Sequence, residues 1–455
     1  MSALAIILAK RGYSVSGSDK KSQKKLDHLR EIGIKIFPNQ VPSNIETISK
    51  GKKHNLVIIS TAVDGTNEEL KAAVTNKIEI WHRSELLASL IKQQKSIAVA
   101  GTHGKTTTTT FLSTLLAIAE KDPTSIVGGE VPIFETNGHN GKGELLVAEA
   151  DESDGSIVRF KADISLITNI ELDHADFYKN LQSLINTMQI FSNNSRTIIA
   201  NFDCKNCRKN INASYWWSTK TNKNVNFAAI PIKQGGDYTF AEIFEEEKSI
   251  GKIKIPVGGS HNLQNAIGAI AACRVYGINY NIIFKGVTKL ARPKRRFEIK
   301  GTWQNRLIID DYAHHPSEII ATIEMANLLL KSDEKYKKLI IVFQPHRYSR
   351  IKKFIDEFAK SFFGVDTLIL TPIYAAGESP KEEITSKFLA NKIKAINSEL
   401  KVHLINEDKS LLSLLEKHTS KNDLIITMGA GDINKIWEQL INNESNDDQS
   451  HFLDN

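Results

Sequence analysis

The segment from Gly101 to Thr107 has the residue types of a phosphate-binding loop. It follows a short apolar run, 97–100, and precedes a helical pattern, so it predicts a strand, a glycine loop and a helix. In that arrangement backbone N–H groups and the helix N-terminus face an anion, Lys105 adds a positive charge, and the Thr106 hydroxyl can ligate Mg²⁺. The longer form of the motif has a glycine where this chain has Val99, so the loop is a shortened variant, and an ordinary strand-to-helix turn is the alternative. The candidate phosphate-binding residues are Gly101, Thr102, His103, Gly104, Lys105, Thr106 and Thr107.

Candidate metal ligands follow two further apolar runs. Glu149 ends the run 145–149, and an acid at the carboxyl end of a buried strand beside a phosphate loop is placed to bind Mg²⁺. His174 lies after the run 164–168, beside the carboxylates of Glu171 and Asp173. An imidazole beside carboxylates can complete a second cation site. The alternatives are a solvated loop acid for Glu149 and a hydrogen-bonded loop residue for His174.

Two amides lie three residues apart, at Asn262 and Asn265, in a helical pattern. This spacing puts them on one helical face. An amide offers a donor and an acceptor together, which suits the edge of a purine. Capping of the helix by Ser260 or Asn262 is an alternative that is compatible with this function.

Two more polar segments, 310–316 and 344–350, follow neighbouring apolar runs, and we expect them to line one crevice of a parallel sheet. The first contains Asp311, His314 and His315, and the second contains His346. Arg347 and Arg350 lie three residues apart on a predicted helical turn and would form a fork for a carboxylate. A zinc site at His314 and His315 would lack further ligands.

The apolar runs predict three α/β domains to position these side chains, at 1–94, 95–294 and 295–455. The pattern of the first domain is typical of the second half of a βαβ nucleotide-binding unit, with a helix followed by a strand that ends at Asp19. The central domain carries the phosphate loop. The third alternates short strands and helices, which predicts a mostly parallel, doubly wound, Rossmann-like sheet. We expect loops and β-hairpins over 205–236 and a linker over 291–296.

Composition narrows the function classes. The net charge of +7, from 59 basic and 52 acidic residues, is spread along the chain and predicts no nucleic-acid partner. Three cysteines predict a reducing compartment without disulfides. Cys204 and Cys207 form a CxxC pair without a second ligand pair, so we expect incidental surface thiols instead of a zinc site. The apolar run 3–9 is too short to insert into a membrane, and we expect a cytoplasmic protein.

In combination these motifs resemble those of the Mur ligases, in that family's order and over nearly the whole chain. The resembling segments are Gly101–Thr108, Glu149–Asp154, Thr168–Glu171 with Asp173 and His174, His261–Asn265, Arg295–Phe297, Asp310–Pro316, Phe343–Arg350, Tyr374–Glu378 and Gly429–Asp432.

The resemblance implies an ADP-forming ligase of peptidoglycan biosynthesis that uses ATP and Mg²⁺. It favours the branch that joins L-alanine to the lactyl carboxylate of UDP-N-acetylmuramate through an acyl phosphate. The three domains would hold the UDP-sugar, ATP and the amino acid, in that order. A ligase that recycles murein tripeptide is one alternative, and 344–350 argues against it. A non-catalytic nucleotide-binding paralogue is the other.

The resemblance also implies residue roles. Catalysis would fall to Lys105, Glu149, His174 and Arg296, with the metal held by Thr106, Glu149 and His174. The nucleotide would contact Asn262, Asn265, Arg296 and Asp311. The amino acid would contact His315, His346, Arg347 and Arg350, and the UDP-sugar would contact Asp19, Ser60 and Arg83.

The N-terminus departs from the family pattern. Family members open with a glycine-rich strand and turn, which should help to cradle the UDP pyrophosphate. This chain begins at the helix that follows this turn. We therefore expect roughly twenty further residues before Met1 in the natural protein.

Overall fold

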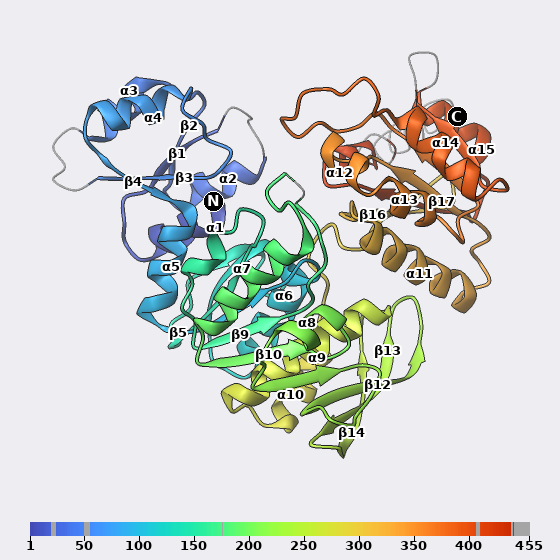
Figure 1. The fold of residues 1–455 in the computed structure, drawn as a ribbon, viewed down its shortest axis with the longest axis horizontal. Helices are drawn as coiled ribbons and strands as arrows, with labels where there is room; N and C mark the ends of the chain where they lie inside the picture. Colours follow the sequence, from blue (N-terminus) through green and yellow to red (C-terminus); the bar gives the residue numbers. More distant parts are fainter. Residues whose placement is uncertain (20–23, 50–54, 175, 406–409, 438–439, 441–455) are drawn as a thin grey trace, which may run out of the picture.

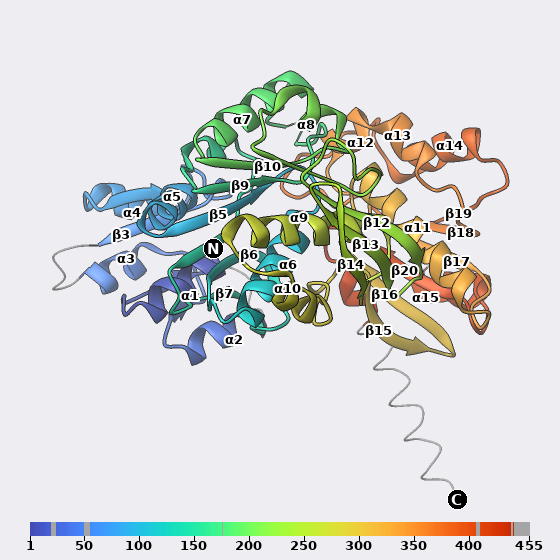
Figure 2. The same cartoon turned by 90° about the horizontal axis from the view of Figure 1, so that it is seen from below.

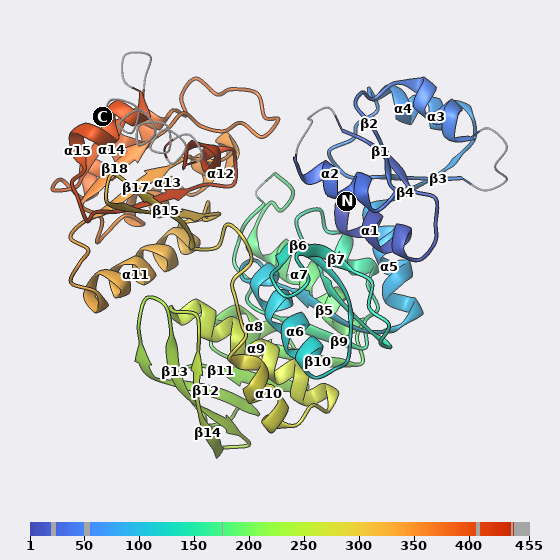
Figure 3. The same ribbon diagram turned by 180° about the vertical axis from the view of Figure 1, so that it is seen from behind.

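The computed structural model describes residues 1–19, 24–49, 55–174, 176–405, 410–437 and 440, which form three α/β parts (Figure 1). In Figures 1 and 3 the central part lies at the bottom, and the first and third parts lie on either side above it. The predicted fold class is confirmed. No helix in the described ranges is long and apolar enough to cross a membrane.

The first part contains two small parallel sheets, β1–β2 and β3–β4. Its helices α1 and α5 pack on the central part, because Ile7 and Leu90 share a buried core cluster with Ala98 of the central sheet. The elements are α1 Ser2–Lys10, β1 Ser16–Ser18, α2 Lys24–Glu31, β2 Lys35–Phe37, α3 Pro42–Ser49, β3 Leu56–Ile59, α4 Glu68–Thr75, β4 Glu79–His82 and α5 Arg83–Gln93.

The central part is built on a ten-stranded sheet in the order β14-β13-β12-β11-β10-β9-β5-β8-β6-β7. Strands β5, β8 and β9 are parallel neighbours, and their apolar residues are buried because helices cover the sheet. Its first elements are β5 Lys95–Ala100, α6 Lys105–Ile118, β6 Thr124–Val131, β7 Thr136–His139, β8 Leu145–Glu149, the 3₁₀ turn η1 Ser156–Arg159, β9 Ile164–Ile167, α7 Leu181–Asn193 and β10 Thr197–Asn201. They are followed by α8 Lys205–Asn210, β11 Tyr215–Ser218, β12 Phe227–Gln234, β13 Thr239–Glu245, β14 Lys248–Ile255, α9 Ser260–Tyr276 and α10 Tyr280–Val287.

Residues 205–236 differ from the expected loops and hairpins. Helix α8 occupies 205–210, and β11 pairs in parallel with both β10 and β12. The meander β12–β13–β14 is antiparallel, as is the pair β6–β7 at the other edge of the sheet. Helix α9 packs against both α6 and β11, and its small residues allow a close approach to β11: a Cβ at Gly268 would lie only 3.4 Å from the Trp217 ring.

The third part has the predicted doubly wound sheet, in the order β15-β16-β20-β17-β18-β19. All of its neighbouring pairs are parallel except β15–β16, an antiparallel edge pair. Its elements are β15 Glu298–Trp303, β16 Arg306–Asp311, α11 Pro316–Ser332, β17 Leu339–Phe343, α12 Tyr348–Lys353, α13 Ile355–Lys360, β18 Thr367–Leu370, α14 Ser386–Ile396, β19 Lys401–Leu404, α15 Leu411–His418, β20 Leu424–Met428 and the 3₁₀ turn η2 Ile433–Lys435. Figure 2 shows this part beside the central sheet, with α11 on the side of β12 and β13.

Candidate active site between the central and third parts

The loop between β5 and α6 has the geometry that a phosphate requires. Gly101 and Gly104 have positive φ angles of 133° and 81°. A Cβ on Gly101 would approach Thr168 Oγ1 to 2.1 Å, and one on Gly104 would approach Asn265 Oδ1 to 2.4 Å, so only glycine fits. Lys105 begins α6, and its Nζ donates to Gly101 O at 2.7 Å. The loop amides and the first turn of α6 thus form an anion-binding terminus.

Thr106 and Glu149 form the first candidate cation site. Thr106 Oγ1 donates to Glu149 Oε1 at 2.9 Å, and the Gly128 N–H donates to Glu149 Oε2 at 2.7 Å. Burial raises the pKa of Glu149 overall, although the charge of Lys105 opposes this rise. A Cβ on Gly128 would lie 2.9 Å from Glu149 Oε2, so glycine there leaves room for the carboxylate. A hydroxyl and a carboxylate are the hard oxygen ligands that Mg²⁺ prefers, so the pair fits this ion.

His174 lies in a second cluster, with Asp151 and Glu152, whose ligand atoms lie within 4.8 Å of one another. His174 Nε2 is 3.3 Å from Glu152 Oε1, and Lys105 Nζ is 2.8 Å from Glu152 Oε2. Burial lowers the pKa of His174, but the hydrogen bond with Glu152 and the charge of Asp173 raise it overall. Glu149 therefore contacts Thr106 next to Lys105, and His174 reaches Lys105 through Glu152.

A third cluster joins the central part to the third. His103 Nε2 is 3.4 Å from Glu171 Oε2, and its Nδ1 is 3.5 Å from Glu318 Oε1 of α11. Ser317 Oγ donates to Glu171 Oε2 at 2.7 Å. Burial lowers the pKa of His103, but its hydrogen bonds with Glu171 and Glu318 outweigh burial and raise the pKa to about 10. A protonated His103 therefore pairs with one carboxylate from each part.

The expectation that no further metal ligands lie beside His315 was wrong. Ligand atoms of His103, Glu171 and His315 lie within 4.8 Å of one another. The rings of His103 and His315 are 4.7 Å apart between centroids. His315 caps α11, since its Nδ1 accepts the Ser317 N–H at 3.4 Å.

The arginines of α12 contact the central part. Arg350 Nη2 is 3.0 Å from Asp173 Oδ1, and Arg347 Nη1 is 2.6 Å from Asp176 Oδ2. Burial raises the pKa of Asp173, but the Arg350 charge outweighs it and holds the pKa well below its usual range. Each arginine therefore pairs with a different aspartate of the central part, and the fork for a substrate carboxylate stays a prediction.

His346 lies next to this arginine contact. Arg350 Nη1 is 3.1 Å from His346 Nδ1. Because a guanidinium only donates, His346 Nδ1 accepts, and the ring hydrogen lies on Nε2. Burial and the neighbouring His314 and Arg350 lower the pKa of His346 to about 3, so the ring is neutral and presents one N–H donor.

The two amides of α9 have partners within the protein. Asn262 Nδ2 donates to Gly258 O at 2.7 Å, and Asn265 Oδ1 accepts from Thr108 Oγ1 of α6 at 3.1 Å. The N-cap of α9 is Gly259, without a side-chain cap, so capping by Ser260 or Asn262 was wrong. Asn265 lies against Gly104 and therefore borders the phosphate loop.

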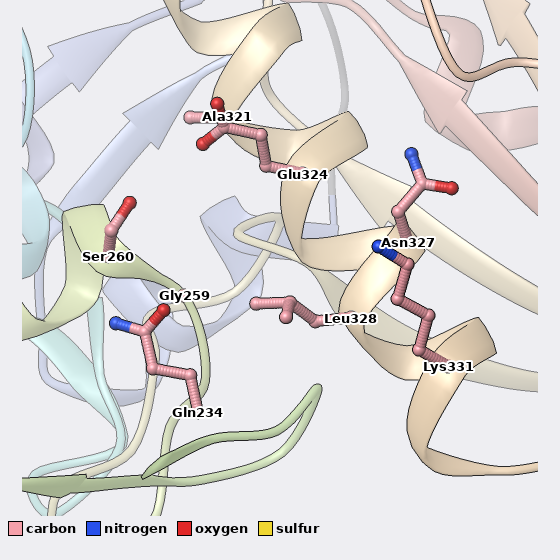
Figure 4. A pocket seen from close by; sticks show the side chains of 8 residues that line it. All are labelled: Gln234, Gly259, Ser260, Ala321, Glu324, Asn327, Leu328 and Lys331. Atoms are coloured by element: carbon pink, nitrogen blue, oxygen red, sulfur yellow. The ribbon is translucent and has the colours of Figure 1, made fainter. Parts of the chain in front are cut away.

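A cavity of about 320 Å³ opens beside the start of α9, between the central part and α11 (Figure 4). In Figure 4 the side chains of Gln234 and Ser260 face Glu324 and Leu328 across it. The lining residues are Gln234, Gly259, Ser260, Ala321, Glu324, Asn327, Leu328 and Lys331. Asn262 and Asn265 do not line it.

Arg296 and Asp311 both lie where the connecting segment enters the third part. Arg296 Nη1 is 3.5 Å from Glu318 Oε1. Asp311 accepts the N–H groups of Phe297 and Ala313, both at 2.7 Å. Burial raises the pKa of Asp311 to about 6, although Arg296 opposes this rise. Arg296 thus shares Glu318 with His103 of the phosphate loop.

Two of the three candidates of the first part lie at neighbouring strand ends, because Ser60 and Arg83 directly follow the paired residues Ile59 and His82 of the parallel strands β3 and β4. Arg83 begins α5 and reaches the central part, where its Nη2 is 3.1 Å from both Asp151 Oδ2 and Asp154 Oδ2. Asp19 follows β1, and Ser60 follows β3. Arg83 is therefore the candidate that the structure connects with the phosphate loop, through Asp151 of the second cluster.

Sequence reasoning missed four acids of the site: Glu152, Glu171, Asp173 and Glu318. Glu318 had a readable signal, because His315 and Glu318 form a capping box at N-cap and N3 of α11. The other three acids lie close in sequence to Glu149 and His174, which the sequence analysis predicted as metal ligands. Their roles depend on contacts with residues that are distant in sequence, which spacing does not give.

Comparisons with known proteins show the family of this chain. Family models match residues 1–95 ("Mur ligase family, catalytic domain"), 99–273 ("Mur ligase middle domain") and 295–431 ("Mur ligase, glutamate ligase domain"). The chain is 49% identical to a UDP-N-acetylmuramate–L-alanine ligase of Prochlorococcus marinus (strain MIT 9313), over 97% of this chain and 91% of that protein.

Solved structures of Mur ligases have folds similar to that of this chain. The crystal structure of a UDP-N-acetylmuramate–alanine ligase from Thermotoga maritima matches with a TM-score of 0.81 and 25% identity, over 98% of this chain and 97% of that one. A murein peptide ligase from Psychrobacter arcticus matches with a TM-score of 0.69 and 19% identity, over 97% and 96%. With its phosphate loop, its acidic clusters and these similarities, the chain belongs to the Mur ligase family.

Proposed function

We propose that this chain is an ADP-forming ligase that joins L-alanine to the lactyl carboxylate of UDP-N-acetylmuramate, for peptidoglycan biosynthesis. The names of three relatives that are each 49% identical to this chain support this reaction. One observation carries the proposal: a continuous run of ion pairs and hydrogen bonds connects the phosphate loop with the third part. Its steps are Lys105–Glu152 at 2.8 Å, Glu152–His174 at 3.3 Å, His174–Asp173 at 3.9 Å, Asp173–Arg350 at 3.0 Å and Arg350–His346 at 3.1 Å.

The reaction requires both ends of this run. A carboxylate is a poor electrophile, so its oxygen first attacks the γ-phosphorus of ATP, and the bond to the bridging oxygen breaks to release ADP. The alanine amine then attacks the carbonyl carbon of the acyl phosphate. The tetrahedral intermediate expels inorganic phosphate and leaves the amide.

The residues of the phosphate loop, 101–107, would bind the ATP phosphates, with Lys105 placed to stabilise charge on the transferring phosphoryl group. Thr106 and Glu149 would hold one Mg²⁺, and His174 with Asp151 and Glu152 would provide the second site. Bound Mg²⁺ would offset the negative charge of the phosphates. Asn262, Asn265, Arg296 and Asp311 remain proposed nucleotide contacts.

The amino acid would bind at the other end of the run. The free N–H of His346 suits an alanine carboxylate, with Arg347, Arg350 and His315 around it. Arg347 is exposed enough to exchange Asp176 for this carboxylate, since its side chain is 32% accessible, whereas that of Arg350 is 6% accessible. Asp19, Ser60 and Arg83 remain proposed contacts of the UDP-sugar.

Product analysis tests the proposal. The purified chain would be incubated with ATP, Mg²⁺, UDP-N-acetylmuramate and either radiolabelled L-alanine or a labelled murein tripeptide. We expect label from alanine in the UDP-sugar fraction. Preferential incorporation of the tripeptide would instead support the recycling ligase, whose fold is also similar.

A further inference from the structure

Cys204 and Cys207 occupy two positions of one helix turn that bring their thiols together. Cys204 is the N-cap of α8, and Cys207 is its third helical residue. Cys207 is fully buried and Cys204 is half-buried, so the expectation of incidental surface thiols was wrong. Residues three apart on a helix have Cβ atoms about 5–6 Å apart, so the two thiols lie side by side on one face of α8. A small shift at the N-cap would let the sulfurs bond.

The two thiols have opposite electrostatic surroundings. The neighbouring Cys207 thiol and the Ile170 N–H, which Cys204 Sγ accepts at 3.4 Å, lower the pKa of Cys204 to about 6 against the effect of burial. The neighbouring Cys204 thiol and burial raise the pKa of Cys207 well above its usual range. At neutral pH Cys204 is therefore a thiolate, the nucleophilic form, and Cys207 is a protonated thiol.

A metal does not account for the pair. Among the described residues, the groups of three or more side chains that could hold an ion contain neither cysteine. The remaining cysteine, Cys273, lies in the core of α9, and burial raises its pKa above the usual range. It therefore serves as an unreactive internal standard.

We propose that Cys204 and Cys207 are a redox-active dithiol, which a low-molecular-weight disulfide converts to an intramolecular disulfide. The Cys204 thiolate attacks one sulfur of the oxidant, the oxidant's S–S bond breaks, and one thiolate leaves. Cys207 then loses its proton and attacks Cys204 Sγ, which expels the second thiolate. The protein loses two electrons and the oxidant gains them, so that one disulfide forms as the other is reduced to two thiols.

Oxidation would reach the active site through Ile170. Cys204 Sγ accepts the Ile170 N–H at 3.4 Å, and Asn206 Nδ2 of the same helix donates to Ile170 O at 2.8 Å. The next residue, Glu171, accepts from Ser317 and has its N–H on Thr102 Oγ1 at 2.9 Å. A disulfide removes the negative charge that holds the Ile170 N–H. We expect the oxidised enzyme to release ADP about tenfold more slowly, the effect of losing one charged hydrogen bond.

Thiol mapping on the full chain tests the dithiol without any substrate. The protein would be equilibrated with glutathione at stepped ratios of disulfide to thiol, alkylated, digested and analysed by mass spectrometry. We expect a Cys204–Cys207 disulfide that dithiothreitol reverses, with Cys273 reduced throughout. The variant Cys207→Ser should instead retain one glutathione on Cys204, because the second thiol is missing.

Two results would overturn the inference. One is free, alkylatable Cys204 and Cys207 at every ratio in the native protein. The other is a disulfide that forms only after unfolding in urea. Equal ADP release from the oxidised and reduced enzymes would overturn the coupling through Ile170. Because mapping uses no substrate, failure of the ligase assay would leave its result intact.

Discussion

Lys105 is a proposed catalytic residue that also has a structural contact. Its Nζ lies in the phosphate loop and also neutralises Glu152, whose side chain is fully buried. We predict that Lys105→Met lowers the rate of ADP release about 10²- to 10³-fold, because one preorganised positive charge is lost. The same variant should melt at a lower temperature, since Glu152 keeps a buried charge without its partner.

The double variant Lys105→Met/Glu152→Gln separates these two roles. It removes the buried charge that Lys105→Met leaves behind. We expect its thermal midpoint to return towards that of the wild type, while ADP release stays low. Recovery of both stability and activity would contradict a catalytic role for Lys105.

Glu149 is predicted to set the requirement for Mg²⁺. Glu149→Gln keeps the shape of the side chain and its contact with Thr106, but it loses the negative charge. The Mg²⁺ concentration for half-maximal ADP release should rise about 10- to 100-fold. Glu144→Gln is the matched control, because Glu144 is an exposed acid just before the same strand. An equal shift in both variants would exclude a specific ligand role for Glu149.

At the scale of elements, Arg350 is expected to hold α12 against the central part. Arg350 and Asp173 are both buried, and they pair at 3.0 Å. Arg350→Ala should lower the free energy of unfolding by about 3–5 kcal/mol in urea titrations, because it leaves Asp173 buried and unpaired. Lys352→Ala, on the same helix but with an exposed partner, should change it by less than about 0.5 kcal/mol. Similar losses in both variants would contradict this account.

The His103 contact between the phosphate loop and α11 predicts a pH dependence. The pKa of His103 is raised to about 10 from 6.5, so its stabilisation is complete below pH 6.5 and is lost as the pH rises through 10. His103→Gln should be less stable than the wild type by about 2 kcal/mol at pH 6, and this difference should disappear above pH 10. Urea titrations of both proteins across this range measure it. A difference that stays constant with pH would show that packing, and not charge, makes the contact.

Elements with continuous apolar runs were predictable from sequence. The predicted run 145–149 is a strand with these bounds, and the short strands predicted for the third domain are present, because parallel strands covered on both faces are apolar throughout. Strand β15 was missed. It is an edge strand, and in Glu298–Trp303 partly exposed polar residues interrupt the apolar pattern.

Candidate site residues were predictable where the motif itself specifies the chemistry. Gly101 and Gly104 have the positive φ angles that glycine adopts readily, and Lys105 begins α6 beside the phosphate loop. The partners of Arg350 and Arg347 were not predictable, because Asp173 and Asp176 are more than 170 residues away in sequence. The buried state of Cys207 was hidden for the same reason, since local composition at 204–210 is polar while the surrounding fold covers it.

At the scale of the whole molecule, the contacts between parts explain how separate substrates would meet. Arg83 connects the first part to Asp151, and Glu171 connects the central part to Ser317 of the third. The sequence motifs predicted three α/β domains but not these contacts. The Arg83–Asp151 and Glu171–Ser317 contacts each hold an acid of the central part beside the crevice where phosphate transfer and amide formation would occur.

The most direct test of the central claim is ADP release by the purified chain with ATP, Mg²⁺ and UDP-N-acetylmuramate, measured with and without L-alanine. The account predicts sustained ADP release only when both UDP-N-acetylmuramate and L-alanine are present, and its loss in Lys105→Met/Glu152→Gln. ADP release that is absent under all conditions, from a protein that is folded and binds ATP, would contradict the ligase and favour a non-catalytic nucleotide-binding protein.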